Sequence, residues 1–325
     1  MLSQQAQVTE AGAQSPGLAQ AIAHSPGLAQ AIVQLAREAS IEINVQDVVH
    51  LEPSRALLPA GTKVYVSHLP KQTWQETEAA CAAVRAAGFE PVPHLPVRLL
   101  TDEGEFERIV AGFIANGRVE EMLLVAGDYP TAAGPFSAVA DVLTTGVLQR
   151  HGLRKVSMAG HPEGHPTVPL DEVRRAEREK VMLATEADLA VSLVTQFFFE
   201  HTPFLAWVGA LRARGVRTRF VGGVAGPARA ATLLKFALRC GVGPSIRALG
   251  ARPSSFMHLI HDHGPEHVVR GLAQAQSAGV AEFGGIHLFC FGGYLRTCEW
   301  LHRVASGNFR LNNEGGFDVG VGHAT

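Results

Sequence analysis

The chain has 325 residues, of which 46% are hydrophobic, and its formal net charge is −2 at pH 7. This length and apolar content suffice for one large domain around a single core. No excess of positive charge exists to bind nucleic acid or an anionic membrane surface. No run of about 18 apolar residues predicts a membrane span, and no basic and then apolar leader predicts secretion. Together with four cysteines and no CxxC pair, this indicates a cytoplasmic protein without membrane or nucleic-acid partners.

A duplicated segment precedes the first predicted strand. The octapeptide SPGLAQAI occurs at Ser15–Ile22 and again at Ser25–Ile32, and each copy offers a serine N-cap with proline at the first helical position. We expect two short helices, or one broken helix, here, in an N-terminal extension of residues 1–39 that carries no chemistry. A role in dimer contacts is the alternative. Residues 40–325 are expected to form the catalytic domain.

From residue 40 onward, short runs rich in Val, Ile and Leu alternate with longer segments of helical period, a pattern typical of strands and helices around a parallel sheet. The eight candidate strands begin at Ile41, Lys63, Phe89, Glu121, Lys155, Leu189, Arg219 and Gly284. The candidate helices are 72–87, 103–116, 136–150, 170–186, 203–214, 228–240, 254–277 and 294–305. This order favours an α/β fold, a closed (β/α)8 TIM barrel with a short N-terminal helical extension, because closure leaves no edge strand. An open doubly wound sheet is the alternative, but no GxGxxG turn follows the first strand.

Polar residues gather at or just after the predicted strand ends, which in a barrel converge on the active face. They are Glu42, Asp47, His68, His94, Asp128, His161, Glu163, His165 and Gln196. A carboxylate inside the first strand, at Glu42, is costly to bury unless it is paired or used, because barrel interiors are usually Val, Ile or Leu. The concentration of polar residues on one rim predicts an enzyme.

Two of these segments allow more than one interpretation. HPEGH places His161, Glu163 and His165 within five residues, as in a metal site, but the flanking prolines prevent the helix that an HExxH zinc site uses. A cofactor-binding loop is the favoured interpretation, with a metal site or turn hydrogen bonds as alternatives. Gln196 is followed by three phenylalanines, 197–199. This amide beside aromatic faces suits a planar heterocycle, although the phenylalanines are equally consistent with plain core.

Four motifs together resemble those of the 5,10-methylenetetrahydrofolate reductase family. The segment 194–200 (VTQFFFE) resembles the family's ITQFFFD, and 161–166 (HPEGHP) resembles YPEVHPE. The segment 127–130 (GDYP) resembles RGDLP, and 91–95 (PVPHL) resembles the strand that reads APHL. The motifs follow the family's order, and the resemblance covers residues from about 40 to 305.

The resemblance implies a barrel with bound FAD, reduced by NADH or NADPH, that passes a hydride to the methylene carbon of methylenetetrahydrofolate. It implies that Glu42 is the general acid, which calls for a raised pKa, and that Asp128 stabilises the cationic intermediate. Gln196 and Phe198 would bind the folate. The residues implied for the cofactor site are His68, His94, Gly127, Asp128, Gly160, His161, His165 and Lys180.

Several family residues are absent. The first strand reads IEINVQ where the family has FEFFPP, the arginine before GD is Ala126, and Gly292 and Gly293 stand where an asparagine and an arginine are expected. These losses suggest two variants: a flavin-free enzyme in which NADH reduces the folate directly, and an enzyme that runs in the oxidative direction. A metal-dependent barrel hydrolase or lyase is a competing hypothesis, and a non-catalytic partner that kept the barrel is another. Since barrels of this family commonly associate, a homo-oligomer is expected.

Overall fold

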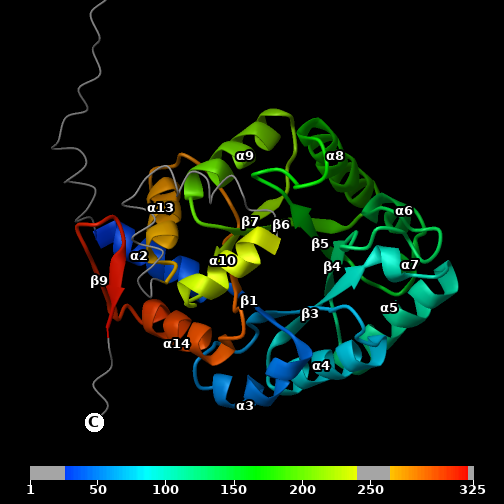
Figure 1. Cartoon of the computed structure of the whole chain (residues 1–325), viewed down its shortest axis with the longest axis horizontal. Helices are drawn as coiled ribbons and strands as arrows, with labels where there is room; N and C mark the ends of the chain where they lie inside the picture. The colour runs from blue at the N-terminus through cyan, green and yellow to red at the C-terminus, as the bar shows by residue number, and fades with distance from the viewer. Residues whose placement is uncertain (1–25, 240–263, 321–325) are drawn as a thin grey trace, which may run out of the picture.

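Eight parallel strands close into a barrel in the computed structural model, which describes residues 26–239 and 264–320. The strands neighbour one another in chain order, and the last pairs with the first (Figure 1). The predicted (β/α)8 barrel is therefore confirmed. The strands are β1 (Ser40–Ile43), β2 (Lys63–Val66), β3 (Glu90–Pro96), β4 (Glu121–Val125), β5 (Lys155–Gly160), β6 (Ala190–Phe198), β7 (Arg219–Ala225) and β8 (Ile286–Phe289).

A ring of helices surrounds the strands (Figure 1). The helices are α2 (Pro26–Arg37), α3 (Leu51–Ser54), α4 (Trp74–Ala86), α5 (Glu103–Gly117), α6 (Val139–Leu143), α7 (Val147–Arg150), α8 (Leu170–Glu186), α9 (His201–Ala213), α10 (Ala230–Arg239), α13 (Glu266–Ser277) and α14 (Tyr294–Ala305), with 3-10 helices η1 (Val45–His50) and η2 (Val97–Leu99). Among the described residues, none of the helices combines the length and apolarity needed to cross a membrane.

Local sequence explains where these helices begin and break. Thr73 and Glu76 form a capping box at the start of α4, and the side chain of Asp102 caps α5. The single helix predicted over 136–150 is wrong: the structure has α6 and α7 in its place. They are separated at Gly146, whose φ of 73° is the left-handed conformation that glycine adopts without steric cost.

The N-terminal octapeptide repeat is only partly within the described residues. Its first copy lies outside them, and most of its second copy forms the start of α2. This helix contacts α13 and α14, and its Ile32 and Leu35 are fully buried. The helix is therefore packed into the outer layer of the barrel beside the last two helices (Figure 1). A short hairpin of β9 (Phe309–Leu311) and β10 (Phe317–Val319), which sequence analysis did not predict, follows α14.

Alternation along the strands separates an outer core from the barrel interior. In β2, Val64 and Val66 belong to the large core under the helices, whereas Tyr65 between them belongs to a separate small cluster. That interior cluster contains Tyr65, Val92, Leu123, Val194 and Val221. It forms an apolar layer across the barrel. Polar interior side chains lie toward the ends of the strands, and they form the candidate site described next.

Candidate active site

Glu42 lies in the barrel interior between two imidazoles. Its Oε2 is 3.5 Å from Nε2 of His94 and 3.6 Å from Nε2 of His287. Its Oε1 accepts a 2.8 Å hydrogen bond from the hydroxyl of Ser67. On the far side of the His287 ring, Nδ1 lies 2.9 Å from Oγ of Ser40. Strands β1, β3 and β8 and the end of β2 thus bring one carboxylate and two imidazoles into a single cluster.

The surroundings of Glu42 decide its charge. Burial raises the pKa of this carboxyl, but the hydrogen bond to His287 and the positive charge that His94 and His287 can carry outweigh burial, so the pKa lies below its ordinary value. Burial also lowers the pKa of His94, although the charge of Glu42 opposes this. The raised pKa expected for Glu42 is therefore wrong, because imidazoles rather than apolar side chains surround it. At neutral pH Glu42 is therefore a carboxylate.

Sequence analysis identified Glu42 and His94 but missed His287. This histidine is 1% exposed, and it belongs to β8, which is otherwise Ile, Leu and Phe. A polar residue in the middle of an apolar strand was the available signal, of the same kind that identified Glu42. Nε2 of His94 is buried and has no hydrogen-bond partner among the described residues, so the cluster retains an open polar position.

A second group of polar residues lies on the loops after β3, β4 and β5. The rings of His161 and His165 meet edge to face at 5.7 Å. Burial and the charges of His161 and Arg98 lower the pKa of His165, while the nearby charge of Asp128 opposes them. Asp128 is exposed and follows Gly127, which has a φ of 89°. The predicted residues of these loops are thus brought together, with Asp128 available to a molecule on this face.

The HPEGHP loop is anchored by two residues of α8 that sequence analysis did not select. Glu177 is 1% exposed and accepts hydrogen bonds from the backbone N of His161 at 2.7 Å and from Nε1 of Trp207 at 3.1 Å. Arg174 pairs with Glu177 at 2.8 Å and donates to the carbonyls of His161 and Pro162. The spacing of one helical turn between an arginine and a glutamate was the available signal. Together they fix the loop against the helix.

The residues implied for FAD do not fit its two phosphates, which require cations or free backbone N–H groups. Lys180 is 9% exposed, its Nζ donates to the carbonyl of Ala159 at 2.6 Å, and burial lowers its pKa to about 8. Arg98 and Arg174 donate to backbone carbonyls, and the N–H of His161 is taken by Glu177. The resemblance puts the cofactor near these groups. The three cations and the N–H of His161 are already hydrogen-bonded to other atoms of the protein.

Gly160 and His68, also implied for the cofactor, have structural partners. A Cβ at Gly160 would lie 2.6 Å from the ring of Trp207, so the glycine makes room for that side chain. The ring of His68 stacks on Trp74 with centroids 4.0 Å apart, and its Nδ1 lies 2.8 Å from Oγ1 of Thr77. Burial lowers the pKa of His68 to about 4. Gly160 thus makes room for Trp207, and Nδ1 of His68 is bonded within the protein.

Gln196 and the phenylalanine run divide between the two faces of β6. The strand has an irregularity between Val194 and Phe197. Phe197 then joins an aromatic cluster with Phe289 and Phe291 at centroid distances of 5.6 and 4.9 Å. Phe198 points the other way and stacks on Phe204 of α9. The structure therefore does not bring Phe198 to the site, whereas Phe197 and Phe199 both belong to the aromatic cluster on the site's side.

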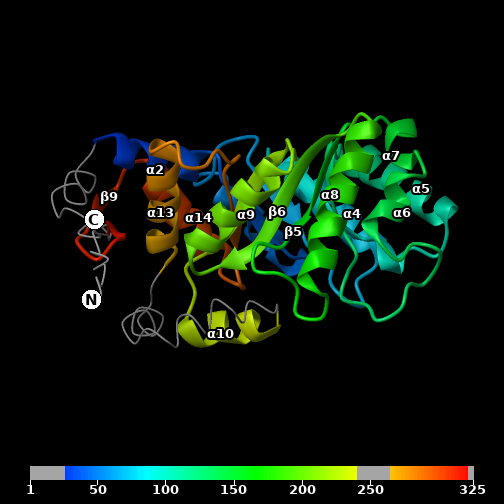
Figure 2. The ribbon, with the colours of Figure 1, turned by 90° about the horizontal axis from the view of Figure 1, so that it is seen from above.

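Helix α10 covers the aromatic cluster at the C-terminal ends of β6, β7 and β8. Its Leu233 and Phe236 pack against that cluster, and the rings of Phe236 and Phe291 are 4.9 Å apart. In Figure 1 this helix crosses in front of the strands, and Figure 2 shows it apart from the ring of outer helices. The mouth of the barrel is thus bordered by an aromatic wall on one side and by the polar loops on the other.

The histidines do not converge on one point. His68 lies against Trp74, His94 against Glu42, and His161 beside His165. In the described ranges, no group of three or more His, Cys, Asp or Glu side chains is arranged to hold a metal ion. The metal-dependent hydrolase or lyase therefore has no site among these residues.

These features define a (β/α)8 barrel with a carboxylate–imidazole cluster in its interior and polar loops at the strand ends, an arrangement typical of barrel enzymes. The chain is 27% identical over 152 residues to a 5,10-methylenetetrahydrofolate reductase from Pectobacterium carotovorum subsp. carotovorum. That match covers 46% of this chain and 48% of the reductase, about half the length of the relative. No family model matches the chain.

Two solved structures are similar to the barrel. A tryptophan synthase from M. tuberculosis has a TM-score of 0.44 at 13% identity, covering 86% of this chain and 98% of that one. A dihydropyrimidinase from Brevibacillus agri has a TM-score of 0.33 at 9% identity, covering 54% of this chain and 41% of that one.

Proposed function

We propose that the protein transfers a hydride between NAD(P)H and the one-carbon unit of tetrahydrofolate, interconverting methylenetetrahydrofolate and methyltetrahydrofolate. The observation that carries this proposal is the half-buried Glu42 beside His94 and His287, at the position where the resemblance implies the general acid. The similarity to the Pectobacterium reductase over 152 residues supports the same chemistry.

The proposed reaction needs a proton before it needs a hydride. Protonation of one nitrogen of the five-membered ring of methylenetetrahydrofolate breaks its bond to the methylene carbon and leaves a cationic iminium at the other nitrogen. The hydride from C4 of NAD(P)H then adds to that carbon, giving the methyl group and NAD(P)+. The cluster around Glu42 supplies the proton from an imidazole, and the carboxylate holds that imidazole in place and stabilises its charged form.

The residues at the mouth of the barrel contribute charge and orientation in this proposal. The carboxylate of Asp128, exposed on the loop after β4, favours the cationic iminium over the neutral ring. The amide of Gln196, half-buried at the end of β6, hydrogen-bonds the edge of the pterin, and Phe197 with its aromatic neighbours packs against the rings.

The hydride passes directly from the nicotinamide to the folate in this proposal. Lys180, the one lysine implied for FAD, donates to the carbonyl of Ala159, and Gly160 makes room for Trp207, so no step is assigned to a flavin. This is the flavin-free variant of the reaction. The direction of net flux is set by the supply of NAD(P)H and of the two folates.

The direct test is an isotope experiment. Purified protein is incubated anaerobically with methylenetetrahydrofolate and NADH or NADPH that carries deuterium on one face of C4, each face in a separate reaction. We expect deuterium in the methyl group of the product for one face only, and no flavin band in the absorption spectrum. Lack of turnover with both nucleotides in both directions would overturn the proposal. A flavin band that bleaches with NADH, with the deuterium lost to water, would overturn direct transfer.

Glu42→Gln tests the role of the cluster. Because the amide cannot stabilise a charged imidazole, we expect turnover to fall at least about 100-fold, the lower limit for general acid catalysis. Nucleotide binding, measured by NADH fluorescence, should be unchanged. Glu52→Gln, at an exposed position of helix α3, is the matched control and should retain full activity. Full turnover in Glu42→Gln would contradict the assignment.

A further inference from the structure

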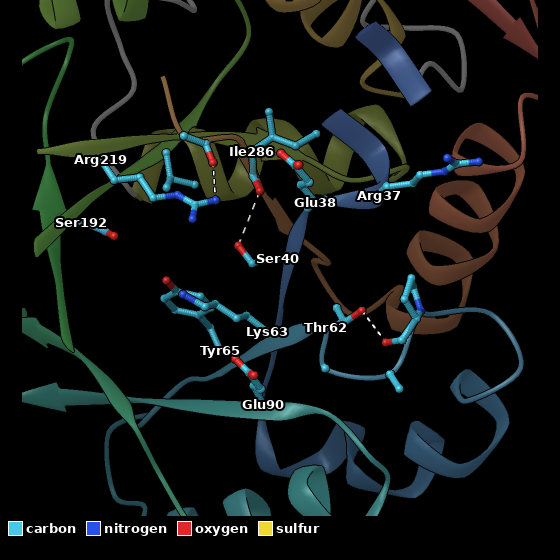
Figure 3. Close-up of a pocket in the computed structure, with 16 residues that line it drawn as sticks. Arg37, Glu38, Ser40, Thr62, Lys63, Tyr65, Glu90, Ser192, Arg219 and Ile286 are labelled. Carbon is cyan, nitrogen blue, oxygen red and sulfur yellow. Dashed lines mark hydrogen bonds between the residues drawn. The ribbon is translucent and has the colours of Figure 1, made fainter. Parts of the chain in front are cut away.

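A cavity of about 390 Å³ lies at the N-terminal ends of the barrel strands (Figure 3). The polar loops of the candidate active site follow the opposite, C-terminal ends of the strands. Ligand pockets typically start at roughly 300 Å³, so this volume admits a small molecule. Its polar lining includes Ser40, Lys63, Tyr65, Glu90, Ser192 and Arg219. Lys63, Glu90 and Arg219 are the first residues of β2, β3 and β7, which places the cavity at the bottom of the barrel.

Arg219 is held across one side of this cavity. Its Nη2 donates a hydrogen bond to the carbonyl of Gly284, drawn as a dashed line in Figure 3. A Cβ at Gly284 would overlap Cγ of Arg219, so only glycine at this position leaves room for the arginine. Arg219 is exposed, and its guanidinium has no carboxylate partner among the described residues.

Glu90 supplies the opposite charge. Figure 3 shows Glu90 and Arg219 on either side of Tyr65. Within the described ranges, Glu90 has no ion-pair partner, whereas Lys63 beside it is neutralised by Glu121 at 2.6 Å. Arg37 and Glu38 also line the cavity, so its charged residues without an ion pair among the described residues are two arginines and two glutamates. Arg219 and Glu90 are the two that lie on either side of Tyr65.

The floor of the cavity between Arg219 and Glu90 contains both polar and apolar side chains. Tyr65 is buried, and its hydroxyl lies 3.0 Å from Oγ of Ser157. Val221 and Ile286 add apolar surface, and Ser40 adds a hydroxyl. Such a floor can accommodate an aliphatic or weakly polar group.

We propose that this cavity binds a small zwitterion of the amino-acid class. Its carboxylate pairs with the guanidinium of Arg219, whose planar fork suits a carboxylate, and its ammonium group pairs with Glu90. Its side chain rests against Tyr65 and Val221. A dianion such as phosphate is disfavoured, because it would be repelled by Glu90 and by Glu38 on the same lining.

The test is calorimetric titration of the full-length protein with each of the twenty common amino acids. We expect at least one to bind with a millimolar or lower Kd. The amide of that amino acid, which lacks the carboxylate, and its N-acetyl form, which lacks the ammonium group, should each bind at least about tenfold more weakly. If no amino acid binds, or if either neutralised derivative binds equally well, the proposal is overturned.

Substitutions of cavity residues test whether the amino acid binds in this cavity. Arg219→Leu and Glu90→Gln should each weaken binding at least about tenfold, while Arg217→Leu, an exposed arginine outside the cavity lining, should leave it unchanged. Glu90→Gln keeps the shape of the side chain, so it remains informative if Arg219→Leu folds poorly. Binding that neither cavity variant weakens would overturn the proposal. All three variants should retain hydride transfer, so this result is independent of the proposed reaction.

Discussion

His287 controls the ionisation of Glu42 from the other end of the chain. Its hydrogen bond and charge lower the pKa of that carboxyl against the effect of burial. In His287→Gln both contributions weaken, so we expect the pKa of Glu42 to rise and the acid limb of the pH profile of kcat/KM to move to higher pH. A merely structural role for His287 would lower kcat/KM without moving the limb.

His68 makes folding stability sensitive to acid. Burial lowers its folded pKa to about 4, whereas an exposed histidine titrates near 6.5. Between these values the unfolded chain binds a proton that the folded protein does not, so the free energy of unfolding falls as pH is lowered from about 6.5 to about 4. His68→Phe keeps a ring against Trp74 and removes the titration, so the loss of stability between pH 7 and pH 5 should be smaller.

Urea unfolding at the two pH values measures this difference. His50→Phe, at an exposed position, is the control and should keep the pH dependence of the parent protein. An unchanged pH dependence in His68→Phe would show that His68 is not the responsible group.

Gly160 is required by packing. A Cβ there would overlap the ring of Trp207, which also donates to Glu177, so Gly160→Ala should lower the free energy of unfolding by about 1–3 kcal/mol, as overpacked cores do. Gly209→Ala in α9 is the control, because its Cβ would meet nothing within 4 Å and alanine favours the helix. Equal urea midpoints for Gly160→Ala and the parent would contradict this account.

The candidate site was predictable only in part at this scale. Glu42 and His94 could be found from the sequence because a polar residue at an interior strand position is costly to bury unless it is paired or used. His287 has the same signal but lies far along the chain from the recognised motifs. The prediction of a raised pKa for Glu42 was wrong, because the pKa depends on which side chains lie around the carboxyl in the folded protein. The resemblance alone implied Phe198 for the folate site, and the irregularity in β6 places its ring against Phe204 instead.

Helix α2 acts as a structural element of the barrel. Leu35 is buried against the outer core, so Leu35→Ala should cost about 2–5 kcal/mol of stability. Gln30→Ala, on the exposed side of the same helix, should cost little. Urea unfolding of both variants is the measurement, and equal midpoints would mean that α2 contributes little to the fold.

Hydrophobic periodicity predicted all eight strands and most of the described helices, and two predicted helices, 170–186 and 294–305, match α8 and α14 residue for residue. The first part of the predicted helix 254–277 lies outside the described residues. The break at Gly146 was missed because glycine inside a helical pattern is often tolerated. The β9–β10 hairpin was missed because its strands have three residues each, too short for a periodic signal.

For the molecule as a whole, the closed barrel could be predicted because eight alternating units leave few different arrangements. Whether the protein binds FAD could not be predicted from the sequence. Binding depends on whether the cations near the site are free or hydrogen-bonded to the protein. The expected homo-oligomer remains a prediction.

The barrel cannot close during translation until its last strand, β8, has been synthesised. Ser40 and His287, which meet where β1 pairs with β8, are 247 residues apart in the chain. At typical translation rates, roughly 12–50 s pass between the synthesis of Ser40 and the synthesis of His287. During that interval β1 is an open edge, and Glu42 is without one of its two imidazoles. The ring of strands and the cluster around Glu42 are therefore completed in one and the same late folding step.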